Sequence, residues 1–274
     1  MQPKTVLITG SSSGIGHATA TAFLDEGWEV YATARNPADV ETLGEQGCSI
    51  ATLDVTEDDD VERVVDRVMD EQGRIDCLVN NAGYAQFGPT EDIPVDAVQQ
   101  QFDVNVYGPH RLTRAVLPHM RRRRDGTIVN VSSVAGRVSF PGGGTYCGSK
   151  FALEAMTDAL RAEVDEYGID AVLIEPGPVE TGFSERAERE LEGIERSGAY
   201  DAFYDVFEDT QAIGGGGLGA VSPERVADDI LNAASATKPA SRVPVGPVAR
   251  AAVLGRFVPD ALRDRAFSLL ERLR

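Results

Sequence analysis

The most constraining feature of the sequence is a regular alternation of short apolar runs with longer amphipathic stretches. The apolar runs occupy residues 5–10, 29–34, 49–54, 76–83, 127–133 and 170–176. Near-continuous apolar runs of this length are typical of strands buried on both faces, and helices between such strands join them as right-handed parallel crossovers. The sequence therefore predicts an α/β fold, a doubly wound parallel sheet with helices on both faces.

The chain length favours one domain. Its 274 residues are 42% hydrophobic, which is enough for a full core at the upper end of single-domain size. The alternation stops after Gly177, and a long, partly helical segment at about 182–221 ends in a glycine run, so we expect a substrate lid there. A further helix is predicted to start at Pro223, with Ser222 as its N-cap.

The charge balance excludes some partners. Asp and Glu total 44 against 26 Lys and Arg, giving a net charge of -18, which disfavours binding to nucleic-acid phosphates. The arginine run at 121–124 is better explained as the solvated end of a helix. Lysine occurs only at Lys4, Lys150 and Lys238. Such a surface is typical of proteins that work in high salt, which we state as a hypothesis. The alternative is a GC-rich genome, which would also favour Arg over Lys.

Metal-binding and secretory signals are absent from the sequence. Three cysteines and three histidines match no disulfide, zinc or other metal-ligand spacing, so we expect reduced thiols and a cytoplasmic protein. The first strand is predicted within a few residues of the N-terminus, which leaves no room for a signal peptide. No apolar run approaches the roughly 20 residues that a membrane span needs.

A glycine-rich turn, "TGSSSGIG" (Thr9 to Gly16), follows the first predicted strand and opens a helix. At this edge of an α/β sheet, glycines let backbone amides approach a pyrophosphate at the positive end of a helix. The letters also fit the nucleophile elbow of an α/β-hydrolase around Ser12. The hydrolase interpretation fails because no histidine follows His119. A purely structural glycine turn is the remaining alternative.

At this point the sequence resembles the short-chain dehydrogenase/reductase family over nearly its whole length. "TGSSSGIG", "LDVT", "NNAG", "DVNVYG", "NVSS", "YCGSK" and "PGPVET" occur in the family's order and spacing. Each motif is weak alone, and the set is specific. The resemblance implies a single Rossmann-type oxidoreductase domain over residues 1–274 with about seven strands, and a homodimer or homotetramer.

The resemblance also implies a nicotinamide dinucleotide site. Relatives that bind NAD carry an acidic residue near the end of the second strand, whereas this chain has Arg35, which can bind a 2′-phosphate, so we expect NADP(H) in preference to NAD(H). A solvated strand-end arginine is the alternative. The expected cofactor contacts are Gly10, Ser12, Ser13, Gly14, Ile15, Gly16, Arg35, Asp54, Val55, Asn81, Ala82, Gly83, Tyr146, Lys150, Pro176, Gly177, Val179 and Thr181.

Several of these residues have simpler explanations. Asp54 fits a strand-end turn as well as an adenine contact, and the segment Asn81–Gly83 could instead hold the sheet together. Pro176 and Gly177 would form a turn in any protein.

The part of the site where the reaction takes place is predicted from Tyr146 and Lys150. They lie four residues apart and so share one face of a helix. A phenol has a pKa of about 10 and must lose roughly three units to act as a base near neutrality. We expect nearby positive charge to dominate over burial in setting that pKa. By resemblance, Ser133 holds the substrate oxygen, and Asn105 holds a water that connects Lys150 to solvent. As alternatives, Ser133 caps a turn and Asn105 caps a helix.

The implied reaction is hydride transfer between a nicotinamide and a carbonyl carbon, with Tyr146 as the acid or base and a small-molecule ketone or alcohol as substrate. The resemblance is greatest to the branch acting on steroids, retinoids and other bulky apolar molecules. A non-catalytic NADP(H)-sensing module is the alternative. Candidate substrate contacts are Tyr84, Phe87, Phe140, Pro141, Phe183, Tyr200, Phe203, Tyr204 and Phe207.

Overall fold

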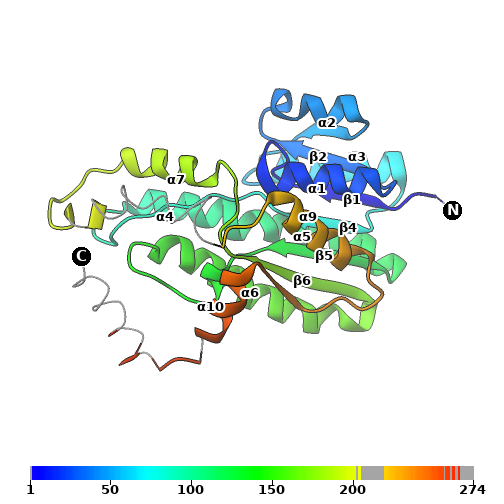
Figure 1. The fold of residues 1–274 in the computed structure, drawn as a ribbon. Helices are drawn as coiled ribbons and strands as arrows, with labels where there is room; N and C mark the ends of the chain where they lie inside the picture. The colour runs from blue at the N-terminus through cyan, green and yellow to red at the C-terminus, as the bar shows by residue number, and fades with distance from the viewer. Residues whose placement is uncertain are drawn as a thin grey trace.

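A computed structural model describes residues 2–201, 203–204, 219–255, 257–259, 261–262 and 265. Within these residues the core of the fold is one seven-stranded parallel sheet with the strand order β3-β2-β1-β4-β5-β6-β7 (Figure 1). The strands are β1 (Thr5–Ile8), β2 (Glu29–Ala34), β3 (Ser49–Thr52), β4 (Cys77–Asn80), β5 (Gly126–Val131), β6 (Ile169–Pro176) and β7 (Arg242–Val245). The predicted doubly wound parallel sheet is confirmed.

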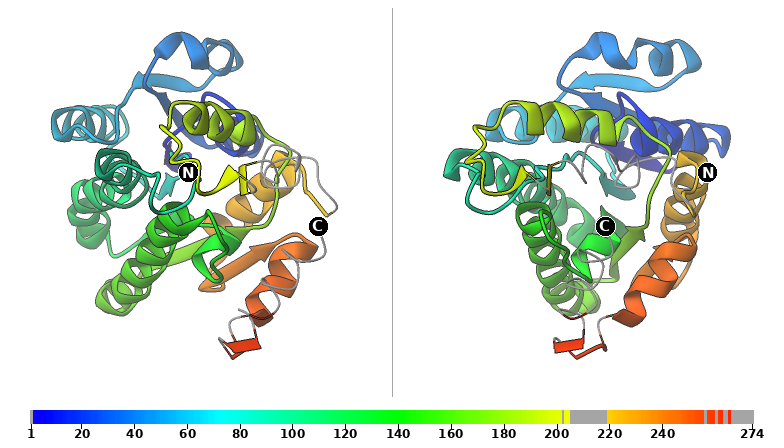
Figure 2. Two further views of the ribbon diagram at one scale, coloured as in Figure 1. Left: turned by 90° about the vertical axis from the view of Figure 1, so that its left-hand side faces the viewer. Right: turned by 60° about the vertical axis from the view of Figure 1, so that its left-hand side comes forward.

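Helices cover both faces of the sheet, as the end-on views of Figure 2 show. The α-helices are α1 (Gly14–Asp25), α2 (Glu41–Gln46), α3 (Asp58–Gln72), α4 (Val95–Phe102), α5 (Gly108–Arg123), α6 (Gly144–Val164), α7 (Phe183–Glu192), α9 (Pro223–Ser235) and α10 (Pro247–Gly255). Short 3-10 turns lie at Pro37–Val40, Val134–Gly136 and Asp165–Tyr167, and a π-helical turn at Asp103–Tyr107 joins α4 to α5.

Strand alternation builds two cores, one on each face of the sheet. Val6 and Ile8 of β1 point into a core that includes residues of α1 and α9, which pack against each other. Leu7, between them, points into the opposite core, which includes residues of α3 and α5. Successive strand side chains point to opposite faces, and here both faces are covered, so the strands are apolar throughout.

The connections from β1 fix where a ligand can bind. β1 pairs with β2 on one side and with β4 on the other, so the chain winds away from β1 in both directions. This reversal opens a crevice outside the carboxyl ends of the strands. The loops that follow β1, β4, β5 and β6 therefore meet at one edge of the sheet.

The observed strand boundaries differ from the sequence pattern mainly at this edge. The run at 29–34 coincides with β2, whereas the runs at 5–10, 76–83 and 127–133 continue past the ends of β1, β4 and β5. The extra residues, "TG", "NAG" and "SS", leave the sheet and enter the crevice. The helix predicted after Ser222 is confirmed, because the Ser222 hydroxyl accepts a hydrogen bond from the Arg225 amide at 3.3 Å.

Other parts of the chain are described only in part. Helix α7 lies in the segment expected to form the lid, while residues 205–218 of that segment and most of the C-terminal stretch 260–274 lie outside the described residues. All three cysteines are buried free thiols. Among the described residues, no helix is long and apolar enough to cross a membrane.

Candidate active site

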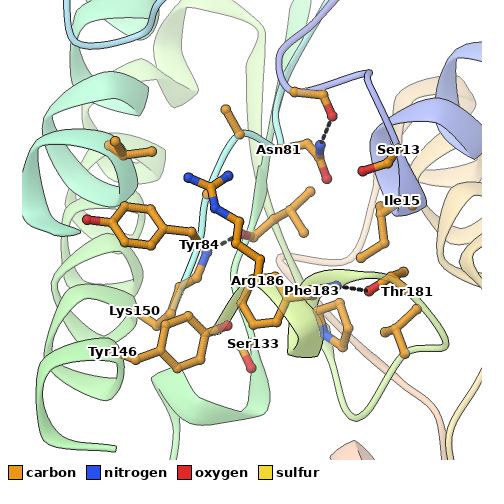
Figure 3. A pocket seen from close by; sticks show the side chains of 18 of the residues that line it. Ser13, Ile15, Asn81, Tyr84, Ser133, Tyr146, Lys150, Thr181, Phe183 and Arg186 are labelled. Atoms are coloured by element: carbon orange, nitrogen blue, oxygen red, sulfur yellow. Dashed lines mark hydrogen bonds between the residues drawn. The ribbon is translucent and has the colours of Figure 1, made fainter. Parts of the chain in front are cut away.

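A cavity of about 1220 Å³ lies along the carboxyl edge of the sheet. Small-molecule sites are typically roughly 300–1000 Å³, so this one has room for a large ligand. Every residue expected to contact a cofactor lines it except Gly16, and of the residues expected to be catalytic only Asn105 does not. The loops after β1, β4, β5 and β6 thus bring together residues far apart in the sequence (Figure 3).

The glycine-rich turn presents the start of α1 to the cavity. Ser13, in extended conformation at the N-cap, makes no side-chain hydrogen bond to the first turn of the helix. The first amides of a helix lack partners inside it, and the helix dipole adds positive potential there, so this end suits a phosphate. Gly14 has φ +54°, and a Cβ added to it would lie 2.9 Å from Thr181 Cγ2. The turn is therefore close-packed against the segment that follows β6.

Gly16 has a packing role. A Cβ at this position would lie 2.1 Å from the carbonyl oxygen of Gly10 and 2.5 Å from Asn81 Nδ2. Asn81 Nδ2 donates hydrogen bonds to the carbonyls of Thr9 at 2.9 Å and Gly10 at 3.0 Å. The sheet-stabilising role considered for Asn81 is thus present, and Asn81 also lines the cavity.

The far end of the cavity, beside β2 and β3, carries charges of both signs. Arg35 follows β2, and Asp54 follows β3. The Asp54 carboxylate accepts hydrogen bonds from the amide and the hydroxyl of Thr56 at 3.0 and 2.7 Å, which is the turn role considered for it. Asp39, which the sequence did not single out, also lines this end and accepts a hydrogen bond from Asn36.

Tyr146, Lys150 and Ser133 meet on one wall of the cavity (Figure 3). Helix α6 carries the tyrosine and the lysine one turn apart, and Ser133 lies just after β5. The Ser133 side chain lies close enough to the Tyr146 hydroxyl to influence its pKa. It also caps the following 3-10 turn, because its Oγ accepts a hydrogen bond from the Ala135 amide at 3.1 Å.

Lys150 is held in place by a hydrogen bond to the backbone of β5. Its Nζ donates a hydrogen bond to the carbonyl of Val131 at 2.9 Å and lies 5.9 Å from the centre of the Tyr146 ring. Both side chains are almost fully buried, at 8% exposure for Tyr146 and 6% for Lys150. The phenol and the ammonium therefore share a site that is poor in water.

Burial is the largest influence on the pKa values of Tyr146 and Lys150. It raises the pKa of Tyr146 to about 12, and the Ser133 side chain opposes it only in part. Burial also lowers the pKa of Lys150 to about 8, against the attraction of Glu154. Lys150 alone does not give the expected dominance of positive charge, because desolvation is the largest influence on the pKa of Tyr146 and disfavours both charged forms. At pH 7 Tyr146 is neutral and Lys150 is charged.

Asn105 lies behind the cavity wall, in the π-helical turn. Its Nδ2 donates to the Tyr84 carbonyl at 2.9 Å and to Ser149 Oγ at 3.1 Å, and its Oδ1 accepts from the Tyr84 amide at 3.1 Å. The Asn105 side chain thus holds the loop after β4 against α6, and it does not cap a helix. π-helical turns of this kind are frequent at functional sites.

The candidate substrate aromatics fall into two groups. Tyr84, Phe87, Phe140 and Phe183 line the cavity, and the Phe183 ring lies 5.8 Å from the ring of Tyr146. The others do not line it: Pro141, Tyr200, Phe203 and Tyr204 lie elsewhere, and Phe207 is outside the described residues.

Tyr200 and Tyr204 anchor the segment after α7. The Tyr204 hydroxyl donates to Asp92 and that of Tyr200 to Glu91, both at 2.8 Å. These tyrosines therefore fasten the expected lid to the loop before α4.

Several other residues that the sequence analysis did not name also line the cavity. Arg186 of α7 points into the cavity, and Val248 and Ala252 of α10 add apolar wall. Arg186 belongs to the run "ERAERE", whose alternating charges are typical of a solvated helix face, so no local signal distinguished it.

Comparison with known proteins gives the same family over most of the chain. The family model described as short chain dehydrogenase matches residues 4–192. The chain is 37% identical to the uncharacterized oxidoreductase YbbO of Escherichia coli, covering 96% of this chain and 93% of that protein. It is 34% identical to 3-ketodihydrosphingosine reductase of Bacteroides thetaiotaomicron over the full length of both chains. Human retinol dehydrogenase 8 is 37% identical, with 88% of this chain and 80% of that protein covered.

Solved structures agree on the fold. A short-chain dehydrogenase from Streptomyces avermitilis superposes with a TM-score of 0.81 at 32% identity, covering 99% of this chain and 98% of the other. The closed form of a serine dehydrogenase, complexed with NADP+, gives a TM-score of 0.76 at 28% identity, covering 89% and 95%. A Burkholderia phymatum relative in complex with NAD gives 0.78 at 25% identity, covering 93% and 91%. From its motifs, its fold and these relatives, the chain belongs to the short-chain dehydrogenase family of oxidoreductases.

Proposed function

We propose that the chain is an NADP(H)-dependent oxidoreductase that interconverts a carbonyl and a secondary alcohol on a bulky apolar substrate. The observation that carries this proposal is the convergence of Ser133, Tyr146 and Lys150 on one wall of a cavity whose other end holds Arg35. A phenol, a hydroxyl and an ammonium at one point suit proton transfer to an oxygen. A helix start and a guanidinium along the same cavity suit a phosphorylated dinucleotide.

In the mechanism that we infer, the neutral phenol of Tyr146 is the proton donor to the oxygen of a ketone, and the same group takes the proton back in the reverse direction. Ser133 Oγ orients that oxygen by a hydrogen bond. Lys150 keeps its positive charge at pH 7 and stabilises negative charge as it develops on the phenol. When bound, NADP(H) supplies or accepts the hydride. Pro176, Gly177, Val179 and Thr181 would line the nicotinamide.

Asn105 and the expected lid have supporting roles in this proposal. The hydrogen bonds of Asn105 to the Tyr84 backbone and to Ser149 would set the position of α6, and through it that of Tyr146. Helix α7 would act as the lid, because it carries Phe183 against Tyr146. We also infer a homodimer or homotetramer, as in the family generally, which light scattering after size exclusion would test.

The preference for NADP(H) is supported by Arg35 and opposed by Asp39. A guanidinium binds a 2′-phosphate by charge-assisted hydrogen bonds, whereas a carboxylate suits the free ribose hydroxyls. Asp39 already accepts a hydrogen bond from Asn36 at 3.0 Å, and Arg35 lines the cavity. Measuring kcat/KM with NADPH and NADH tests the preference, and a higher value with NADH would refute it.

An apolar substrate is supported by the wall of the cavity near Tyr146. Tyr84, Phe87, Phe140 and Phe183 line it together with Val138, Val248 and Ala252. Two similar proteins carry names that point to long apolar molecules, a 3-ketodihydrosphingosine reductase and a retinol dehydrogenase. Apolar walls discriminate weakly between such molecules, so we propose the class and not a single compound.

The experiment that tests catalysis follows NADPH absorbance against aliphatic, aromatic and steroidal ketones and long-chain 3-ketones. We expect turnover with the bulky ketones, and Tyr146→Phe should lower kcat by at least about 100-fold while NADPH binding is retained. Tyr107→Phe is the matched control, because Tyr107 is 51% exposed and outside the cavity. Tight NADPH binding without turnover of any ketone would favour the sensing module, and unchanged rates in Tyr146→Phe would refute the mechanism.

A further inference from the structure

Arg186 is a cation inside the cavity that the proposed reaction does not use. It belongs to the first turn of α7, and its guanidinium lies 4.9 Å above the centre of the Tyr84 ring (Figure 3). Its ion pair with Glu190, one turn along the helix, is long, at 3.8 Å, and 38% of each side chain is exposed. An exposed pair of this kind contributes little stability, so it does not account for the position of Arg186.

The packing of α7 fixes this position. Phe183, Ala187 and Leu191 recur on one face of the helix and pack into the aromatic cluster that contains Tyr146. Residues three or four apart share a helix face. When this face is buried, the side chain of Arg186 points into the cavity. Before the helix, Thr181 is packed tightly against Gly14 of the glycine-rich turn. Helix α7 and the residue Thr181 before it therefore contact both the cluster around Tyr146 and the glycine-rich turn.

Arg35 lines the same cavity as Arg186. Both guanidiniums line it, and both lie close enough to the Tyr84 hydroxyl to influence its pKa. Burial is the largest influence that lowers the pKa of Arg186, and the charge of Arg35 is the next largest. Two like charges that converge in a partly buried cavity repel each other, and an anion bound between them would turn this repulsion into attraction for both.

We propose that Arg186 of the lid and Arg35 bind the same anion, the 2′-phosphate of NADP(H), so that the helix closing the substrate side also contributes to cofactor choice. This inference rests on the proposed NADP(H) dependence. Arg35 follows β2, the strand beside the adenosine ribose in this kind of fold, which places the shared anion at the 2′ position rather than at the pyrophosphate. Guanidinium–phosphate contacts are charge-assisted and each contributes roughly 1.5–3 kcal/mol, or about 10- to 100-fold in affinity.

The test measures the dissociation constants of NADPH and NADH by the fluorescence of the reduced nicotinamide, in the absence of substrate. The variants are Arg186→Gln, Arg35→Gln and the double variant. Arg189→Gln is the matched control, because it removes a positive charge from the same helix at an exposed position outside the cavity. Circular dichroism and the melting temperature establish that each variant is folded.

We expect Arg186→Gln to weaken NADPH binding by about tenfold or more and to leave NADH binding within about twofold. Arg189→Gln should change neither. Because both arginines contact one phosphate, the double variant should lose NADPH affinity by a factor that differs from the product of the single losses.

Two results would overturn the inference. Equal weakening of NADPH and NADH binding by Arg186→Gln would mean a pyrophosphate contact, and unchanged NADPH binding would mean no phosphate contact. A different result would refute the proposed NADP(H) dependence: the unaltered protein would bind NADPH no more tightly than NADH. A wild-type preference for NADPH that is lost in Arg35→Gln but kept in Arg186→Gln would refute only the role of the lid arginine.

Discussion

The burial of Lys150 makes a quantitative prediction about stability. The side chain is 6% exposed, and burial lowers its pKa from 10.5 to about 8. Each pKa unit corresponds to about 1.4 kcal/mol, so the folded chain holds this ammonium at a cost of about 3 kcal/mol relative to water. Lys150→Met removes the charge and keeps a side chain of similar length. The variant also leaves the Val131 carbonyl without its donor, which costs roughly 1–3 kcal/mol at any pH.

The pH dependence separates these two effects. Below pH 8 the lysine is protonated in both the folded and the unfolded chain, so the full cost of burying the charge is present. Between pH 8 and pH 10.5 the folded chain has released the proton and the unfolded chain still holds it, so the free energy of unfolding rises with pH. Lys150→Met lacks this rise. The stability of the variant relative to wild type should therefore fall by about 1.4 kcal/mol per pH unit above pH 8, or by about 2 kcal/mol at pH 9.5.

Urea unfolding between pH 6.5 and pH 9.5 at constant ionic strength measures this difference. Tyr146, with a pKa of about 12 in the folded chain, does not titrate in that range. Lys238→Met is the control, because Lys238 is exposed and its loss should give a curve parallel to that of wild type. If the Lys150→Met and wild-type curves also run parallel up to pH 9.5, then burial does not govern the charge of Lys150 and the reasoning is refuted.

Three further predictions concern packing, a buried ion pair and the reaction direction. Gly16→Ala should lower the melting temperature by several degrees, because its Cβ would meet the Gly10 carbonyl at 2.1 Å, whereas Gly44→Ala in α2, whose nearest contact is a side chain at 3.4 Å, should leave it unchanged or higher. Asp76→Asn should cost about 3 kcal/mol in urea unfolding at pH 7, because the buried carboxylate accepts hydrogen bonds from two arginines and the Thr5 amide. These contacts lower the pKa of Asp76, so that contribution should be present above about pH 4 and lost below it, and an acid unfolding curve unchanged by the substitution would contradict this. For Tyr146, the rate of alcohol oxidation should rise with pH between 7 and 9 more steeply than the rate of ketone reduction, and equal slopes would count against a phenol that starts out neutral.

Much of the site could be predicted because its residues follow local rules. The end of a buried strand is visible in the sequence, and parallel strands bring their carboxyl ends to one edge, so Gly10, Asn81 and Ser133 could be placed together without coordinates. The spacing of Tyr146 and Lys150 on a helix likewise fixes their common face. These predictions need only periodicity and topology.

The remainder depends on three-dimensional packing. The sequence does not reveal that Gly16 lies against a backbone carbonyl, or that the Asn105 side chain makes hydrogen bonds to Tyr84 and Ser149. Arg186 resembles any surface arginine until the buried face of α7 is known. The pKa of Tyr146 also could not be judged from the sequence, because desolvation scales with burial, and burial is a property of the whole fold.

The two pKa values together indicate which proton transfers the site favours. A phenol with a pKa of about 12 carries its proton at pH 7, and converting it into the phenolate that acts as a base costs about 7 kcal/mol at that pH. Lys150 does not remove this cost alone, since burial is the largest influence on both groups and the lysine itself is close to losing its proton. Proton abstraction therefore requires additional positive charge beside the phenol, which the oxidised form of a nicotinamide would bring. In reduction the phenol starts in the protonated form that burial already favours, and Lys150 stabilises the negative charge that the phenol gains, whereas use of Tyr146 as a base would depend on which form of the cofactor is bound.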